Sequence, residues 1–276
     1  MGVLLGLLSA LGYGASDFVA GVGGRRSSVG ALTIVAQPLG LVTALVAIVI
    51  VPGHGPTSPA LWWGALGGVG SGVGTVSLYR GFVVGKMGVV SPLSAVLTAL
   101  IPVAAGLALG EVPSVIVLAG VALAVPAAAL ISTQHDDSEG PASGAGYGVA
   151  AGIGFGVLFV ALDQAGTASG AWPLLPGQIV ALLVVIPLAL HWSSRPLGWR
   201  LAVLPGAAAG TLGGIANLLF LAATGAGQLA VVAVLTALYP GVTLLLAGAV
   251  LGERWERVQV VGLLVAAAAI ILITTG

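Results

Sequence analysis

The sequence predicts an all-α integral membrane protein with ten transmembrane helices arranged as a five-plus-five inverted repeat. Three observations lead to this prediction. Of the 276 residues, 58% are hydrophobic and only 6% are charged, whereas a soluble domain carries about 25% charged residues. Ten apolar stretches each approach the roughly 20 residues that a helix needs to cross the hydrocarbon core. Finally, VLTALIP at residues 96–102 returns almost unchanged as VLTALYP at residues 234–240.

The composition also excludes several classes of protein. Eight basic and eight acidic side chains cannot form the polar surface of a soluble protein of this size. The formal net charge is zero, which leaves no basic surface for a nucleic acid partner. The absence of cysteine excludes disulfides, thiolate metal sites and cysteine nucleophiles. Because His54, His135 and His191 fall in predicted loops without zinc-binding spacing, we expect no metal and no other cofactor.

Short loop-forming segments separate the predicted spans. GGRR at 23–26, PGHGP at 52–56 and HWSSRP at 191–196 are typical of such loops. The first span is not expected to be a signal peptide, because no basic segment precedes it and Asp17 interrupts its apolar stretch. The predicted spans cover residues 2–21, 29–51, 59–80, 88–109, 113–132, 145–163, 172–190, 200–223, 227–251 and 257–275.

A strongly polar run, TQHDDSEGPASG, lies near the middle of the chain. It predicts a first five-helix repeat over residues 1–135, a polar linker over 136–144 and a second five-helix repeat over 145–276. An odd number of spans in each half makes the second half enter the membrane in the opposite direction, as in inverted repeats. The two VLTALxP motifs then occupy the fourth span of each half.

A second triplet, Leu-Gly-Glu, follows each copy of the motif, at residues 109–111 and 251–253. The gap between the proline and this triplet is four residues shorter in the first half, which is about one helical turn. We therefore expect the fourth helix of the first half to end differently from its counterpart.

The best-matching stretches for a known family are GVVSPLSAVLTALIPVAAGLALGE at 88–111 and GQLAVVAVLTALYPGVTLLLAGAVLGERWERVQVVG at 227–262. On these stretches, and over nearly its whole length, the chain resembles the EamA-type family of the drug/metabolite transporter superfamily. The resemblance implies a secondary carrier for amino acids, nucleosides, sugars or related small metabolites, often moved outward. The halves differ after the triplet, because Val112 and Pro113 follow Glu111 whereas Arg254 and Trp255 follow Glu253.

Asp17 is the strongest candidate for a functional residue. A charge at the bilayer centre costs about 2.5–3.5 kcal/mol on insertion scales, so a retained one indicates a function. Ser9, Tyr13, Ser16 and Asp17 recur at helical spacing, which places them on one stripe facing other helices. The stripe predicts a site for a substrate amine or a proton. The alternative is an aspartate near the helix end that pairs with Arg25 or Arg26.

Other polar residues are expected to line the same cavity. Arg80, beside Tyr79, can pair with Asp17, bind a substrate carboxylate or reach the lipid headgroups. Serines and threonines also serve as simple hydrogen-bond donors between helices, whereas amides should point inward because their exposure to lipid is costly. The full predicted set of cavity residues is Tyr13, Asp17, Gln37, Tyr79, Arg80, Ser94, Thr98, Gln178, Asn217, Thr236 and Tyr239.

Prolines and glycines predict the shape of the helices. Pro102 and Pro240 lie at equivalent places inside two predicted helices, where each can act as a hinge or as a static kink. GGVGSGVG at 67–74 lies in an apolar segment without a following Gly-Lys-Ser/Thr, so nucleotide binding is rejected. Glycines every four residues along 144–156 predict a close helix contact.

Basic residues fall only in the odd-numbered loops or at their edges, which places both termini outside the cytoplasm by the positive-inside rule. Members of the family that the chain resembles commonly have cytoplasmic termini, so the two indications disagree. The basic residues are Arg25, Arg26, Arg80, Lys86, Arg195, Arg200, Arg254 and Arg257.

The favoured hypothesis is a carrier in the cytoplasmic membrane that moves a small polar or amphipathic, amino-acid-like metabolite by alternating access. Proton coupling through Asp17 and facilitated diffusion are both compatible with the sequence. The alternative is a non-transporting membrane scaffold or sensor, although ten helices leave it little surface for signalling. A membrane enzyme is disfavoured because the sequence contains no clustered catalytic groups. The sequence contains no signal for an oligomeric state.

Overall fold

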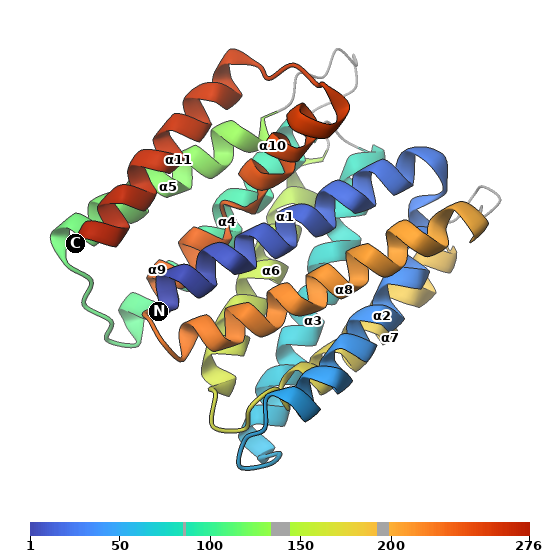
Figure 1. Cartoon of the computed structure of the whole chain (residues 1–276), viewed down its shortest axis with the longest axis horizontal. Coiled ribbons are helices and arrows are strands. Elements are labelled where there is room, and N and C mark those ends of the chain that lie inside the picture. Colours follow the sequence, from blue (N-terminus) through green and yellow to red (C-terminus); the bar gives the residue numbers. More distant parts are fainter. Residues whose placement is uncertain (85–86, 134–143, 192–198) are drawn as a thin grey trace.

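The structure, a computed structural model of the whole chain, describes residues 1–84, 87–133, 144–191 and 199–276. These residues form helices and loops without any strand, which confirms the all-α prediction for them (Figure 1). Most of the predicted linker, residues 136–144, lies outside the described residues. The helices are α1 Gly2–Arg26, α2 Val29–Ile50, α3 Ser58–Val84, α4 Met87–Ala108, α5 Val115–Ser132, α6 Ala145–Ala165, α7 Leu174–His191, α8 Trp199–Thr224, α9 Leu229–Thr236, α10 Tyr239–Leu251 and α11 Arg257–Thr275.

Eight segments of the described chain are long and apolar enough to cross a membrane. One of them, Leu229–Leu251, contains both α9 and α10. The two remaining predicted spans correspond to α7, whose apolar part is Leu174–Leu190, and to the 27-residue α3, which is rich in glycine. A multi-pass membrane protein is therefore supported, while the five-plus-five repeat stays a prediction.

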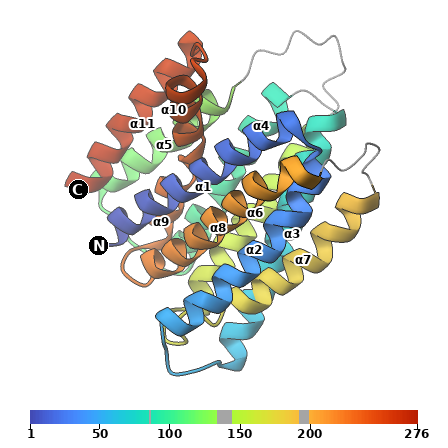
Figure 2. The same cartoon turned by 45° about the vertical axis from the view of Figure 1, so that its right-hand side comes forward.

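The helices pack side by side in several connected groups. α1 lies against α8 and α10, and α2 lies against α7 and α8 (Figure 1). α6 packs between α3 and α4, and α3 also contacts α7. α5 and α11 form a pair at one side of the bundle, joined to the rest mainly through α4, with smaller contacts to α9 and α10 (Figure 2).

Glycines on two faces of α6 allow its close packing. Side chains at Gly148 and Gly152 would lie 2.8 Å from the carbonyl oxygens of Val90 and Ser94 on α4. On another face, a side chain at Gly154 would lie 2.6 Å from the Gly70 carbonyl oxygen of α3. Small residues permit this approach of helix backbones in membranes. The close contact predicted from the four-residue glycine spacing is confirmed, and its partner is α4.

The ninth predicted span differs from the prediction because it is broken. We expected Pro240 to lie inside a helix over 227–251, but α9 ends at Thr236 and α10 begins at Tyr239, with Pro240 in its first turn. Proline has no N–H to continue the helical hydrogen bonds and disfavours helical geometry in the residue before it. Pro102, in contrast, lies within the continuous helix α4. The two prolines therefore have different local structures.

The short helix α9 occupies the centre of the bundle. All eight of its residues are buried. Ala230 and Val234 belong to a hydrophobic cluster with α4, α5 and α11, whereas Val232 and Ala233 belong to a second cluster with α2, α6 and α8. α9 thus connects the two apolar cores of the protein.

Candidate functional site

One face of α1 is bound to α8 by three side-chain hydrogen bonds. The hydroxyls of Ser9 and Ser16 donate to the carbonyl oxygens of Ala216 and Ala209 at 2.9 and 2.8 Å. Between them, the Tyr13 hydroxyl donates to Oδ1 of Asn217 at 2.7 Å. These contacts confirm that the polar stripe of α1 faces other helices.

Tyr13 also belongs to an aromatic cluster formed by four helices. Its ring centroid lies 6.1 Å from those of Phe159 on α6 and Tyr239 on α10. Phe159 stacks on Phe220 of α8 at a centroid distance of 4.2 Å. Phe159 and Phe220 were not among the predicted site residues, because an isolated phenylalanine in an apolar stretch carries no distinguishing signal. The cluster fills the space between α1, α6, α8 and α10.

Asp17 lies one turn from Tyr13 on the same side of α1. The lipid-facing side of α1 is marked by Leu4 and Leu11, which are 55% and 50% exposed, and Asp17 does not lie on it. Asp17 is nevertheless exposed. This carboxylate is therefore accessible on a side of α1 that does not face lipid.

Two further observations describe the surroundings of Asp17. Gly21, one turn further along α1, is exposed, and a side chain built there would meet nothing within 4 Å. Within the described part of the chain, the Asp17 carboxylate takes part in no hydrogen bond and no ion pair. Pairing of Asp17 with Arg26 or Arg80 is thus not present, and the side chain of Arg25, the other predicted partner, lies outside the described side chains. Arg80 is half-buried near the end of α3.

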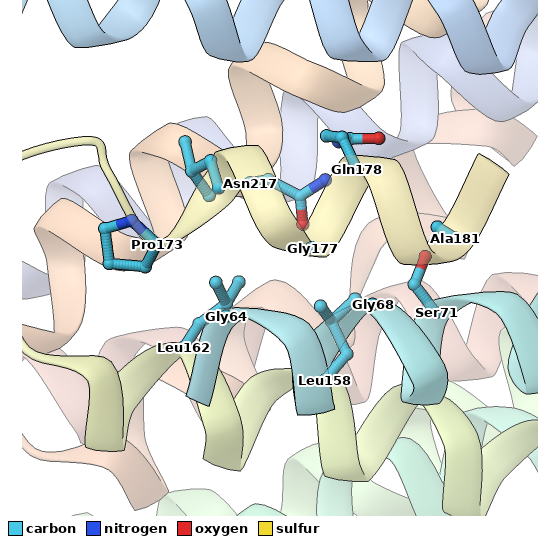
Figure 3. A pocket seen from close by; sticks show the side chains of 11 residues that line it. Gly64, Gly68, Ser71, Leu158, Leu162, Pro173, Gly177, Gln178, Ala181 and Asn217 are labelled. Carbon is cyan, nitrogen blue, oxygen red and sulfur yellow. The ribbon is translucent and has the colours of Figure 1, made fainter. Parts of the chain in front are cut away.

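A small cavity of about 20 Å³ lies between α3, α6, α7 and α8 (Figure 3). Ser71, Gln178 and Asn217 contribute its polar side chains, and Gly64 and Gly68 form part of its wall. This volume suits about one water molecule, since a water needs roughly 10–15 Å³. In this conformation the cavity is too small for a metabolite.

Asn217 connects the cavity to the aromatic cluster. Its Nδ2 donates to the Gly213 carbonyl oxygen at 3.1 Å, while its Oδ1 accepts from Tyr13 and its side chain lines the cavity. Gln178 also lines the cavity, and it packs where Gly40 of α2 leaves room for its amide. The two predicted amides therefore lie around one polar interior region, and Gln37, three residues before Gly40, is half-buried on α2.

The predicted hydroxyl residues have two different environments. Thr236 donates to the Gly6 carbonyl oxygen at 3.3 Å, which is a contact between α9 and α1. Ser94 and Thr98 on α4 are 2% and 1% exposed, and neither hydroxyl has a partner among the described residues. Neither residue lines the small cavity. The side chain of Tyr79, another predicted site residue, lies outside the described side chains.

The described residues contain no group of three or more metal-ligating side chains. His54 is exposed in the loop after α2. The side chains of His135 and His191 lie outside the described part of the structure.

One face of the bundle is closed by contacts between loops. His54 N–H donates to the Ala168 carbonyl oxygen at 2.9 Å, and the hydroxyls of Thr57 and Ser169 lie 3.2 Å apart. The N-terminus lies on this face, since a side chain at Gly2 would lie 2.8 Å from the Ala226 carbonyl oxygen. Asp17, near the other end of α1, belongs to the opposite face.

Comparisons with known proteins agree with this architecture. Residues 142–275 match the model of the EamA-like transporter family. A protein of known crystal structure superposes with a TM-score of 0.72 at 17% identity, covering 99% of this chain and 96% of its own. That similarity shows the fold alone. No curated protein sequence matches. The second half of the chain is therefore similar to the EamA-like transporter family of the drug/metabolite transporter superfamily.

Proposed function

We propose that the protein is a secondary carrier that moves a small, amine-bearing metabolite, such as an amino-acid-like compound, across the cytoplasmic membrane by alternating access. The observation that carries this proposal is the Asp17 carboxylate, which lies away from the lipid-facing side of α1, is exposed, and has no partner among the residues that the structure describes. A charge inside a membrane protein is costly unless another charge or a proton compensates it. The missing cation is supplied by the substrate, by a proton, or by both in turn.

Aromatic rings next to Asp17 favour an organic cation over an inorganic one. Tyr13 lies one turn away and places its ring 6.1 Å from that of Tyr239. Aromatic faces attract ammonium groups and also provide apolar contact area. Tyr13 transmits this contact to Asn217 through its hydrogen bond. A substrate bound against Tyr13 therefore affects both α1, which carries Tyr13, and α8, which carries Asn217.

Alternating access requires two bundles that move relative to each other. The helix contacts support two such repeats, over residues 1–135 and 145–276, joined by the linker 136–144. Exchanging the halves places α6 on α1, α7 on α2, α8 on α3, α9 with α10 on α4, and α11 on α5. The contact of α1 with α8 then corresponds to that of α6 with α3. Likewise, the contact of α2 with α8 corresponds to that of α7 with α3. In this scheme, Pro102 and the break before Pro240 are the hinges.

The membrane orientation follows from the charges. The basic side chains at Arg26, Arg200 and Arg257 lie near the end of α1 and the starts of α8 and α11, at the face where Asp17 is exposed. The positive-inside rule assigns this face to the cytoplasm and both termini to the outside. An impermeant reagent is therefore expected to label either tagged terminus in intact cells. Labelling only after the cells are permeabilised would reverse this orientation.

The test of the carrier itself is a search for its substrate. We expect amine-bearing and zwitterionic metabolites to raise the thermal unfolding temperature of the purified protein, because they bind the folded state. The same compounds should exchange across liposomes in counterflow. Binding confined to neutral or anionic compounds would contradict the role of Asp17. A full panel without stabilisation or counterflow would contradict the carrier.

A further inference from the structure

Glu111 follows α4 in the first half and reaches the second half. Its carboxylate accepts hydrogen bonds from the backbone N–H groups of Leu229 and Ala230, and the bond from Ala230 is 2.9 Å long. A tight turn positions it: Gly110 has a φ of 94°, and Glu111 N–H donates to the Gly106 carbonyl oxygen at 2.9 Å. A side chain on Gly106 would collide with the carboxylate.

This contact caps α9 from outside its own sequence. The first N–H groups of a helix lack partners within the helix, and the helix dipole favours a negative charge beside them. The residue before α9, Gln228, forms no side-chain capping hydrogen bond. Glu111 supplies the acceptor that the local sequence does not provide. Because the acceptor is ionisable, each of these hydrogen bonds is stronger than one between neutral groups.

The corresponding glutamate of the second Leu-Gly-Glu triplet has a different environment. Glu111 is half-buried on the closed face, whereas Glu253 is exposed. Asp163, at the end of α6, lies close enough to Glu111 for the two negative charges to repel each other. The Asp163 carboxylate accepts a 2.9 Å hydrogen bond from the Gln164 amide. The two glutamates, Glu111 and Glu253, are expected to have unequal contacts if the face that carries Glu111 is closed while the opposite face is open.

We propose that Glu111 is a positioning residue for transport, which holds the start of α9 against the first half while the bundle is open beside Asp17. Its release frees α9 to move when the opposite face opens. The break between α9 and α10 lets this short helix move separately from the rest of its span. The proposal rests on the proposed function, because only a carrier with two alternately open faces needs such a contact.

The experiment measures how fast a water-soluble maleimide reacts with single cysteines in the purified full chain. The protein has no cysteine of its own, so each introduced thiol is unique. Ala233→Cys places a reporter on α9, where the residue is 0% exposed. Gly21→Cys places one in the open space beyond Asp17. Each reporter is measured alone and combined with Glu111→Ala, Glu111→Gln or Asp163→Asn.

We expect Glu111→Ala to increase the reaction rate at Ala233→Cys about tenfold, which corresponds to about 1.4 kcal/mol. The rate at Gly21→Cys should fall, because opening one face closes the other. Glu111→Gln should change both rates in the same directions but less, since its amide oxygen still accepts without the charge. Asp163→Asn, the matched control, removes a like charge beside Glu111 but keeps both hydrogen bonds between Glu111 and α9. It should therefore not increase the rate at Ala233→Cys and should leave the rate at Gly21→Cys near that of the unmodified background.

Two results would overturn the proposal. An unchanged rate at Ala233→Cys would show that Glu111 does not restrain α9, and an increase at both reporters would indicate general loosening. If Glu111→Ala does not fold, the rates with Glu111→Gln decide by the same criteria. The maleimide reaction needs no substrate. A failed metabolite search would therefore contradict the carrier, whereas unchanged maleimide rates would contradict only the role of Glu111.

Discussion

Asp17→Asn is expected to reduce counterflow of an amine substrate about 10- to 150-fold, because the substrate loses a charge-assisted interaction worth about 1.5–3 kcal/mol. Asparagine keeps the size and hydrogen-bonding groups of the side chain but removes the negative charge. The measurement is the initial counterflow rate in liposomes at a substrate concentration below KM. Binding of the amine, followed by thermal stabilisation, should weaken in parallel.

The matched control is Asp163→Asn, which removes a carboxylate from the opposite end of the bundle. It should keep most of the counterflow, because Asp163 is hydrogen-bonded to Gln164 and lies away from the Asp17 face. Equal activity of Asp17→Asn and the unmodified protein would contradict the proposed site. The same variant also separates the coupling modes. Should Asp17→Asn retain full transport driven by a pH gradient, Asp17 is not the coupling group.

Gly154→Ala is expected to produce the largest loss of stability among single-methyl substitutions in α6. The added methyl carbon would lie 2.6 Å from both Gly70 O and Gly74 N, and 2.8 Å from Gly74 Cα. All three are backbone atoms of α3, so relief requires separation of the two helices. Overpacking of this kind costs about 1–3 kcal/mol and occasionally more. The thermal unfolding temperature in detergent should fall accordingly.

Gly146→Ala provides the comparison on the same helix. A methyl group there meets nothing within 4 Å, and alanine favours a helix over glycine by about 0.5–1 kcal/mol. Gly146→Ala should therefore leave the unfolding temperature unchanged or raise it slightly. Equal unfolding temperatures for Gly154→Ala and Gly146→Ala would show that α3 and α6 are not in such close contact.

Periodicity and composition predicted the helices and several of their contacts. The apolar stretches located the spans, the stripe containing Tyr13 identified the side of α1 that faces α8, and the glycine spacing identified a packing face of α6. Each of these features depends on residues a few positions apart in one helix, where the geometry is fixed. Such local patterns are readable without knowledge of the partner helix.

Features that depend on distant partners could not be predicted. VLTALIP and VLTALYP differ in one residue, yet only the second copy breaks its helix. The start of α9 is capped by Glu111, which lies 118 residues earlier than Leu229, and Thr236 is bonded to Gly6 of α1. The repeated Leu-Gly-Glu marked Glu111 as unusual but gave no indication of its partner. The aromatic stack of Phe159 and Phe220 is likewise formed only by the tertiary fold.

The complete burial of α9 has a consequence for how the bilayer acts on this protein. The outer pair α5 and α11 presents exposed apolar side chains such as Val115, Ile116, Leu264 and Ile271, so changes in acyl-chain length impose hydrophobic mismatch on these helices. α9 is surrounded by protein on every side and receives such strain only through its neighbours. A change in lipid thickness should therefore tilt the outer helices α5 and α11 before it disturbs α9 at the centre.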